Sequence, residues 1–258
     1  MSLVASHSAS ISGNLAPRTL SQSEISLFWR EQRSLQRSIV RARVPVRAYH
    51  HAVVSREPAL SVGKRVMDIA CASAALVFLA PLLISVATAI KLTSSGPVLF
   101  NQNRYGYRNR RFRIHKFRTM YTHLADSSGT RQTVGNDPRV TPLGRFLRKT
   151  SIDELPQLFN VIKGDMSLVG PRPHVPRMQA ASILYEDLVP YYFQRHCVRP
   201  GITGLAQVSG CRGSTATAES AISRIDYDLE YIENWSLWLD VKVMVRTVVR
   251  EFISGSGE

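Results

Sequence analysis

The run IACASAALVFLAPLLISVATAI, from Ile69 to Ile90, contains 22 residues and no charged side chain. As a straight helix it would extend about 33 Å, which is enough to cross the apolar part of a bilayer. A buried core helix is the less favoured interpretation, because the run is longer and more evenly apolar than most core helices. The sequence therefore predicts a membrane element.

Both flanks of this run are basic, and basic flanks prefer the cytoplasm. The charges before it are Arg56, Lys64 and Arg65, and those after it are Lys91, Arg104, Arg108 and Arg110. Two cytoplasmic ends conflict with a single crossing. Pro81, near the middle, removes a backbone hydrogen bond and is predicted to break the helix there. We expect a re-entrant element that returns to its starting side, with a plain span as the alternative.

Three regions follow from this assignment. Residues 1–60 are rich in Ser and Arg and are predicted to be a flexible basic arm without the features of a secretory signal. Residues 61–92 form the re-entrant membrane helix, and residues 93–258 form a cytoplasmic catalytic domain. The net charge of +14 suits partners that carry phosphate. Three scattered cysteines predict neither a disulfide framework nor a zinc site.

Two segments of the soluble body have clear periodicity. Val98–Arg104 and Arg111–Phe117 alternate as two strands around a turn. Trp235–Phe252 has a helical period that gathers five apolar side chains on one face, and this face either packs in the core or docks on a membrane surface. These are Trp238, Val241, Val245, Val248 and Phe252. The predicted fold class is helix-rich α+β: a re-entrant helix, then a compact domain with a small β-hairpin and amphipathic interfacial helices.

Asp153 and Glu154 lie at the start of a predicted helix whose apolar positions recur with helical spacing. These positions are Leu155, Leu158, Phe159 and Ile162. The acids have two interpretations. Ser151 with Glu154 fits a capping box, but Pro156 fits better if Asp153 is the cap. Alternatively the acids are catalytic, at a helix N-terminus that would bind a diphosphate beside Arg145, Arg148 and Lys149. Spacing alone leaves both open.

Other basic residues lie in stiff or turn-forming segments that suit phosphate. Arg172 stands in the helix-breaking GPRP segment, and Arg199 begins a second turn, RPGITG. Lys116 and Arg118 end the second strand and are equally compatible with ordinary surface charges. The histidines show no metal-ligand spacing, so no catalytic role is assigned to them.

Taken together, the chain resembles the bacterial sugar transferase family, the monotopic polyprenyl-phosphate hexose-1-phosphate transferases. The similarity runs from Lys64 to about Phe252, and its wording after Pro173 is most like the short members that initiate exopolysaccharide synthesis. It is carried by KRVMDIA, GPVLFNQNRYG, KFRTM, DPRVTPLGRFLRKTSIDELPQLFNVIKGDMSLVGPRP, RPGITGLAQVSG and DYDLEYIENWSLWLD.

The resemblance implies a covalent, two-step reaction that releases UMP. Asp153 would be the nucleophile, and Glu154, with Asp153, would bind the Mg²⁺ that family members use. Asp228 matches another motif acid of less certain task. The predicted phosphate-binding residues are Arg148, Arg172, Lys116, Arg118, Arg145 and Arg199. The expected partners are UDP-hexose and polyprenyl phosphate at the bacterial inner membrane, with the catalytic domain on the cytoplasmic side and no nucleic acid; a homo-oligomer is left open.

Two other functions were weighed against this one. A membrane-bound metal-dependent nucleotide-sugar hydrolase would use the same acids with water as the acceptor. A membrane-tethered nucleic-acid-binding protein would explain the basic charge but not the acidic pair or the apolar run. The sequence does not identify the hexose; UDP-glucose and UDP-galactose are the first donors to test.

Overall fold

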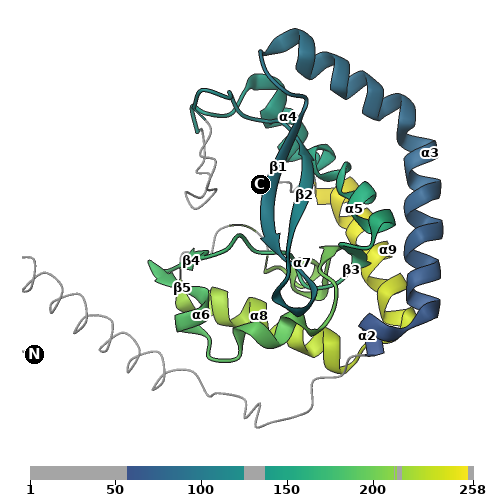
Figure 1. Ribbon diagram of the computed structural model, residues 1–258, viewed down its shortest axis with the longest axis vertical. Coiled ribbons are helices and arrows are strands. Elements are labelled where there is room, and N and C mark those ends of the chain that lie inside the picture. The colour runs from purple at the N-terminus through teal and green to yellow at the C-terminus, as the bar shows by residue number, and fades with distance from the viewer. Residues whose placement is uncertain (1–56, 125–136, 212, 214–216, 255–258) are drawn as a thin grey trace, which may run out of the picture. The chain divides into compact units, whose positions relative to one another are not determined.

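The computed structural model describes residues 57–124, 137–211, 213 and 217–254 (Figure 1). The predicted N-terminal arm lies outside the described residues, except for its last four, which form the short helix α2 (Glu57–Leu60). The chain then enters α3 (Val62–Thr93), a helix of 32 residues. The Ser61 hydroxyl caps its start by accepting a hydrogen bond from the backbone N–H of Lys64.

The apolar run lies within α3, which is long and apolar enough to cross a membrane. Many of its apolar side chains, among them Val77, Phe78 and Ile84, are exposed. A core helix would bury these side chains against the rest of the protein. The structure therefore disfavours the core-helix interpretation and fits a membrane-associated helix.

The helix does not end at Pro81, contrary to the expected break. One α-helix continues from Val62 to Thr93 with Pro81 inside it, and Figure 1 shows that α3 bends along its length. Proline has no N–H to give the preceding turn, and the Ser85 hydroxyl donates to the Pro81 carbonyl at 2.8 Å, a contact that also favours bending. Pro81 therefore bends a continuous helix, and the re-entrant topology stays a prediction.

The predicted β-hairpin is confirmed. Strands β1 (Leu99–Tyr105) and β2 (Arg111–Phe117) pair antiparallel, with Leu99 opposite Phe117 and Tyr105 opposite Arg111. A short 3₁₀ turn, η1 (Tyr107–Asn109), joins them. As the alternation predicts, Ile114 is buried while Arg111 and Arg113 face outward.

The other elements are short until the last two helices. They are α4 (Pro142–Lys149), η2 (Ile152–Glu154), α5 (Gln157–Lys163), β3 (Ser167–Val169), β4 (Gln179–Ala180), β5 (Ile183–Leu184), α6 (Tyr185–Leu188), η3 (Tyr192–Cys197), β6 (Gly201–Thr203), α7 (Leu205–Val208), α8 (Ala218–Glu233) and α9 (Leu237–Ser254). Strands β3 and β6 pair parallel, and β4 and β5 pair antiparallel. The helix-rich α+β class is thus confirmed for the described residues.

Parallel strands β3 and β6 meet closely where the chain leaves β3. A Cβ added to Gly201 would lie 2.1 Å from the backbone nitrogen of Gly170, so no larger residue fits at Gly201 without moving the backbone. Gly170 opens the segment that carries Arg172. The close approach fixes where this segment begins.

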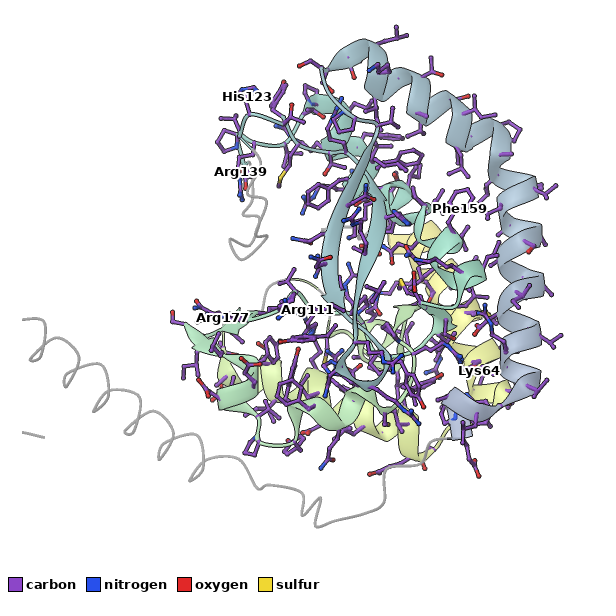
Figure 2. All side chains as sticks on the ribbon, in the orientation of Figure 1. Lys64, Arg111, His123, Arg139, Phe159 and Arg177 are labelled. Atoms are coloured by element: carbon purple, nitrogen blue, oxygen red, sulfur yellow. The ribbon has the colours of Figure 1, made fainter. Side chains whose placement is uncertain are left out.

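Buried polar side chains in the first turns of α3 form hydrogen bonds with β3. Asp68 accepts from the Ser167 hydroxyl at 2.8 Å and from the Leu168 N–H at 3.0 Å. Lys64, labelled at the foot of α3 in Figure 2, donates to the Val169 carbonyl at 3.0 Å and to Asp240 of α9 at 2.6 Å. These charged groups are nearly inaccessible to solvent. The membrane-associated helix is therefore joined to the strand that leads into the Arg172 segment.

Helix α9 turns the predicted apolar face outward. Its inner side carries Val243, 1% exposed, and Asp240. Trp238 is 64% exposed, and Val245 and Val248 are also exposed. The core-packing interpretation of this face is therefore wrong, and docking on a membrane surface stays a prediction. The Phe252 side chain lies outside what the structure describes.

Candidate active site

The acidic pair lies in a tight connection between two helices. Helix α4 begins at Pro142 after the cap Thr141, whose hydroxyl accepts from the Gly144 N–H at 2.9 Å. After α4, Ser151 adopts a left-handed conformation with φ 55°, and the 3₁₀ turn η2 presents Asp153 and Glu154. Pro156 occupies the N-cap position of α5 and supplies no side-chain cap. The structure therefore does not support capping of α5 by Ser151 or Asp153.

Glu154 is held by two cations. Its Oε1 accepts from Lys116 Nζ at 2.7 Å and from Arg172 Nη2 at 2.5 Å, and its Oε2 accepts from Arg172 Nη1 at 3.1 Å. Burial alone would raise the pKa of Glu154, but Arg172 and Lys116 hold it well below its usual range. Glu154 is therefore ionised throughout the neutral pH range.

Asp153 has a different environment from its neighbour. Asp153 is 9% exposed, and burial raises its pKa to about 6. The negative charge of Glu154 adds to this rise. The positive charges of Lys116, Arg148 and Arg172 oppose it. Two adjacent carboxyls thus have pKa values moved apart, which is typical of functional sites. At neutral pH Asp153 is mostly ionised but less tightly held than Glu154, as a nucleophilic carboxylate requires.

Three of the predicted phosphate-binding residues converge on the acids: Lys116 from β2, Arg148 from α4 and Arg172 from the segment after β3. Arg145 lies exposed on α4. The first three come from distant parts of the sequence, so only the fold brings them together. Their positive charges, set against two carboxylates, form a site suited to phosphate oxygens.

Arg118 and Arg199 have other positions than expected. Arg118 is buried, and its Nη2 donates to the Ser94 carbonyl at 2.8 Å and its Nη1 to the Pro97 carbonyl at 2.5 Å, so it caps the C-terminal end of α3. Arg199 Nε donates to the Gly164 carbonyl at the end of α5, at 3.2 Å. Both guanidinium groups bind backbone carbonyls rather than facing the acids. In this structure both side chains hold helix ends, and their assignment as phosphate ligands stays a prediction.

Asp228 is linked to the Arg172 segment through Arg195. It belongs to α8 and accepts from Arg195, with Arg195 Nε at 2.9 Å and Nη2 at 2.7 Å from its Oδ2. Arg195 Nη2 also donates to the Arg172 carbonyl at 2.6 Å.

Two arginines near the site were not predicted as ligands. Arg195 is one, and Arg104 of β1 is the other: its Nη1 donates to the Pro173 carbonyl at 3.3 Å. Burial and, next, the positive charge of Arg172 lower the pKa of Arg104 to about 10. In the sequence, the only indication that Arg104 lies near the site is its position on the inward face of the hairpin, opposite Phe112. The sequence gives no such indication for Arg195.

The described residues contain no group of three or more His, Cys, Asp and Glu side chains that could hold a metal. Asp153 and Glu154 nevertheless offer adjacent hard oxygen donors, and Mg²⁺ is commonly bound by one or two carboxylates together with substrate phosphates and water. These two residues fit a Mg²⁺ ion that arrives with a phosphate ligand. The buried His174 and His196 have pKa values lowered by burial and show no such grouping.

Comparisons with known proteins identify a family and several relatives. The family model described as bacterial sugar transferase matches residues 59–254. An undecaprenyl-phosphate glucose phosphotransferase of Komagataeibacter xylinus is 52% identical over 191 residues, which is 74% of this chain and 36% of that protein. A UDP-glucose:undecaprenyl-phosphate glucose-1-phosphate transferase of Xanthomonas campestris pv. campestris is 46% identical over 207 residues, 80% of this chain and 42% of that protein.

A shorter relative matches over nearly its whole length. The exopolysaccharide production protein PSS of Rhizobium leguminosarum bv. phaseoli is 52% identical over 194 residues, which is 75% of this chain and 97% of that protein. The chain thus spans less than half of the two longer relatives and almost all of this short one. The expected similarity to short exopolysaccharide-related members is confirmed.

Proposed function

This chain belongs to the bacterial sugar transferase family, and we propose that it transfers a hexose 1-phosphate from a UDP-hexose to polyprenyl phosphate and releases UMP. Relatives named UDP-glucose:undecaprenyl-phosphate glucose-1-phosphate transferases support this reaction and make UDP-glucose the first donor to test. The relative named as an exopolysaccharide production protein supports a role in starting exopolysaccharide synthesis.

The proposal rests on a contrast between the two acids. The negative charge of Glu154 is balanced by the positive charges of Lys116 and Arg172, whereas buried Asp153 has a pKa of about 6. In the first step an Asp153 carboxylate oxygen attacks the phosphorus that carries the sugar. The bond from this phosphorus to the oxygen of the nucleoside phosphate breaks, and UMP leaves with the electron pair. An aspartyl phosphosugar remains on the enzyme.

In the second step an oxygen of polyprenyl phosphate attacks the same phosphorus. The bond to the Asp153 oxygen breaks, which frees the carboxylate and gives a polyprenyl diphosphate sugar. Arg148, Arg172 and Lys116 neutralise phosphate oxygens in both steps, because anionic groups would otherwise repel each other. Lys116 and Arg172 exchange Glu154 oxygens for phosphate oxygens when the donor enters.

Glu154 and Asp153 would hold Mg²⁺ together with the diphosphate of the donor. When bound, Mg²⁺ lowers the charge on the phosphate oxygens and thereby helps the nucleoside phosphate to leave. Glu154 is suited to this role because it is ionised at neutral pH. Its pairing with two cations keeps it in place before the donor arrives.

The membrane contacts would bring the site to its lipid acceptor at the cytoplasmic side of the inner membrane. Helix α3 supplies an exposed apolar surface, and the outward face of α9 supplies a second one with Trp238 beside Lys242, whose Nζ lies 5.6 Å from the ring centroid. Such an aromatic and basic pair suits the interface between headgroups and acyl chains. Quenching of fluorescence by brominated lipid in the native protein, but not in Trp238→Phe, would support this contact; equal quenching would contradict it.

The test of the reaction is intact-mass spectrometry of the full chain with Mg²⁺ and a panel of UDP-sugars, without lipid acceptor. The native chain is expected to gain the mass of one hexose phosphate, and Asp153→Asn is expected to gain none. Asp187→Asn, which changes an exposed carboxylate of α6, is the matched control and should gain the same mass as the native chain.

Other outcomes would redirect the assignment. Adduct on Asp153→Asn would contradict the nucleophile. Repeated UMP release without polyprenyl phosphate would indicate a hydrolase that uses water as acceptor. No adduct and no UMP release with any donor, even after polyprenyl phosphate is added, would refute the proposed transfer.

A further inference from the structure

The segment that carries Arg172 is held by its backbone carbonyls. The Arg172 carbonyl accepts from Arg195 Nη2 at 2.6 Å, and the Pro173 carbonyl accepts from Arg104 Nη1 at 3.3 Å. The next carbonyl, that of His174, accepts from the Tyr105 backbone N–H at 3.0 Å. Three consecutive peptide groups are therefore fixed from two other elements, η3 and β1. A position so fully determined is what a substrate-binding arginine needs.

Arg195 makes the shortest of these contacts and is inaccessible to solvent. A buried guanidinium is costly unless an opposite charge lies beside it. Asp228, 2% exposed, supplies this match through Arg195 Nε and Nη2. Because a guanidinium is planar, the Nε hydrogen bond to Asp228 Oδ2 and the approach of Nη2 to the same oxygen at 2.7 Å set its orientation, and Nη2 also donates to the Arg172 carbonyl.

We propose that Asp228 and Arg195 are positioning residues: Asp228 orients Arg195, and Arg195 holds the Arg172 segment so that the Arg172 side chain meets Glu154 and the phosphates of the donor. The kinetic part of this inference rests on the proposed transferase function. It gives Asp228 a task other than that of a reacting acid. Asp228 contacts Arg195, whose Nη2 also donates to the Arg172 carbonyl, and these contacts link Asp228 to the Arg172 segment.

The first test is a double-mutant cycle on kcat/KM for UMP release, with UDP-glucose or another active donor, polyprenyl phosphate and Mg²⁺. Asp228→Asn, Arg172→Ala and the double variant are compared with the native chain. Asp228→Asn keeps the size of the side chain and is expected to lower kcat/KM by about 10- to 100-fold, the usual cost of misplacing a substrate-binding group. In the Arg172→Ala background the same change should have little further effect, because residues that act as a unit are not additive.

A merely structural role would give a different pattern. It would lower kcat/KM by the same factor in both backgrounds, and that result would overturn the proposal. Asp240→Asn is the matched control, since Asp240 is also buried and paired with a cation, Lys64, but does not contact the Arg172 segment. It should lower thermal stability while leaving kcat/KM close to the native value.

Two conservative variants sharpen the test. Arg195→Lys keeps the positive charge but replaces the planar guanidinium with a single ammonium nitrogen, which cannot reproduce both the Nε and the Nη2 contacts, so it should lose as much activity as Asp228→Asn. Asp228→Glu restores the carboxylate and should recover most of the loss. Full activity of Arg195→Lys would show that charge alone is sufficient and would contradict the positioning role.

A measurement independent of turnover separates this inference from the proposed function. Hydrogen–deuterium exchange of peptides that contain Arg172 and His174 should be faster in Asp228→Asn than in the native chain or in Asp240→Asn. Unchanged exchange would refute the positioning role even if the enzyme is active. Faster exchange in a protein that releases no UMP would uphold the structural link and refute only the transferase.

Discussion

Replacing the proposed nucleophile should make the protein more stable. Burial, with a smaller contribution from the Glu154 charge, raises the pKa of Asp153 from its ordinary 3.8 to about 6 against the opposing charges of Lys116, Arg148 and Arg172. In Asp153→Asn the side chain is neutral in both the folded and unfolded chain, so this difference disappears. A shift of about 2 pKa units corresponds to about 3 kcal/mol of folding free energy, since each unit is worth about 1.4 kcal/mol. The carboxyl is 9% exposed, so solvent screens this effect little.

The sign of the effect depends on pH. The unfolded chain loses the Asp153 proton near pH 4, whereas the folded chain keeps it until about pH 6. The native protein therefore loses stability from this group as pH rises from about 4 to 6, and the lower stability persists above pH 6. Asp153→Asn should be as stable as the native protein at about pH 4, and its free energy of unfolding should be about 3 kcal/mol higher than the native value at pH 8.

The assay is thermal unfolding of full-length protein in detergent with EDTA, because bound Mg²⁺ would itself favour ionised Asp153. For a chain of this size about 3 kcal/mol corresponds to a Tm increase of about 6–12 °C at pH 8. Asp187→Asn, on the surface of α6, is the control and should not change Tm. A Tm for Asp153→Asn equal to or below the native value at pH 8, or a gain independent of pH, would refute the reasoning.

Further predictions concern catalysis and the membrane helix. The rate of UMP release should rise with pH through about 6 as Asp153 ionises, and a flat rate between about pH 5 and 8 would contradict the nucleophile. EDTA should abolish UMP release and Mg²⁺ restore it; full activity in EDTA would exclude the metal requirement. Arg118→Met should lower Tm, because it removes the hydrogen bonds at the C-terminal end of α3. The KM for UDP-glucose should not change. A raised KM would indicate that Arg118 binds the donor. In separate variants, Glu57→Cys and Ser95→Cys should both react with a thiol reagent applied from the cytoplasmic side. When Pro81→Leu is added, only one of the two should still react. If only one of the two reacts while Pro81 is present, α3 is a plain span.

The hairpin and the amphipathic character of α9 could be predicted because they depend on local periodicity. What α9 packs against could not. The apolar stripe with Trp238 and Val245 is exposed, and the inner side is held by Val243 and the charged but fully buried Asp240. A stripe of apolar residues shows that a helix has an apolar partner, but core and lipid are equally apolar. The buried acid gave no signal because its partner, Lys64, is far away in sequence.

The apolar face expected for the helix after the acids was only partly correct. Leu158 is buried, but Phe159 is 55% exposed, while the polar Gln157 and Asn160 are buried. The Asn160 side chain accepts from the His115 N–H and donates to the Arg113 carbonyl, so it completes the hydrogen bonds at the edge of β2. A buried amide of this kind serves a strand more than forty positions earlier, and sequence period cannot reveal it.

The acidic pair and Arg172 were found from sequence because tight turns, prolines and charge stand out locally. Their division of roles was not visible there. Burial raises the pKa of Asp153, whereas Arg172 and Lys116, which come from other elements, hold the pKa of Glu154 low against its own burial. The same applies to the surroundings of Arg118, which the sequence does not reveal. Only the fold shows that backbone carbonyls occupy its guanidinium.

The hydrogen bonds between α3 and β3 also bear on the distance between the acidic pair and the membrane surface. Asp68 and Lys64 join the first turns of α3 to the strand that leads into the Arg172 segment, and Arg172 in turn contacts Glu154, so the position of α3 is linked to that of the acidic pair. If α3 lies in the bilayer as proposed, the depth at which lipid holds its apolar surface determines how far the acids stand above the headgroups. The length of the surrounding acyl chains would then alter the reach between Asp153 and the phosphate of its lipid acceptor.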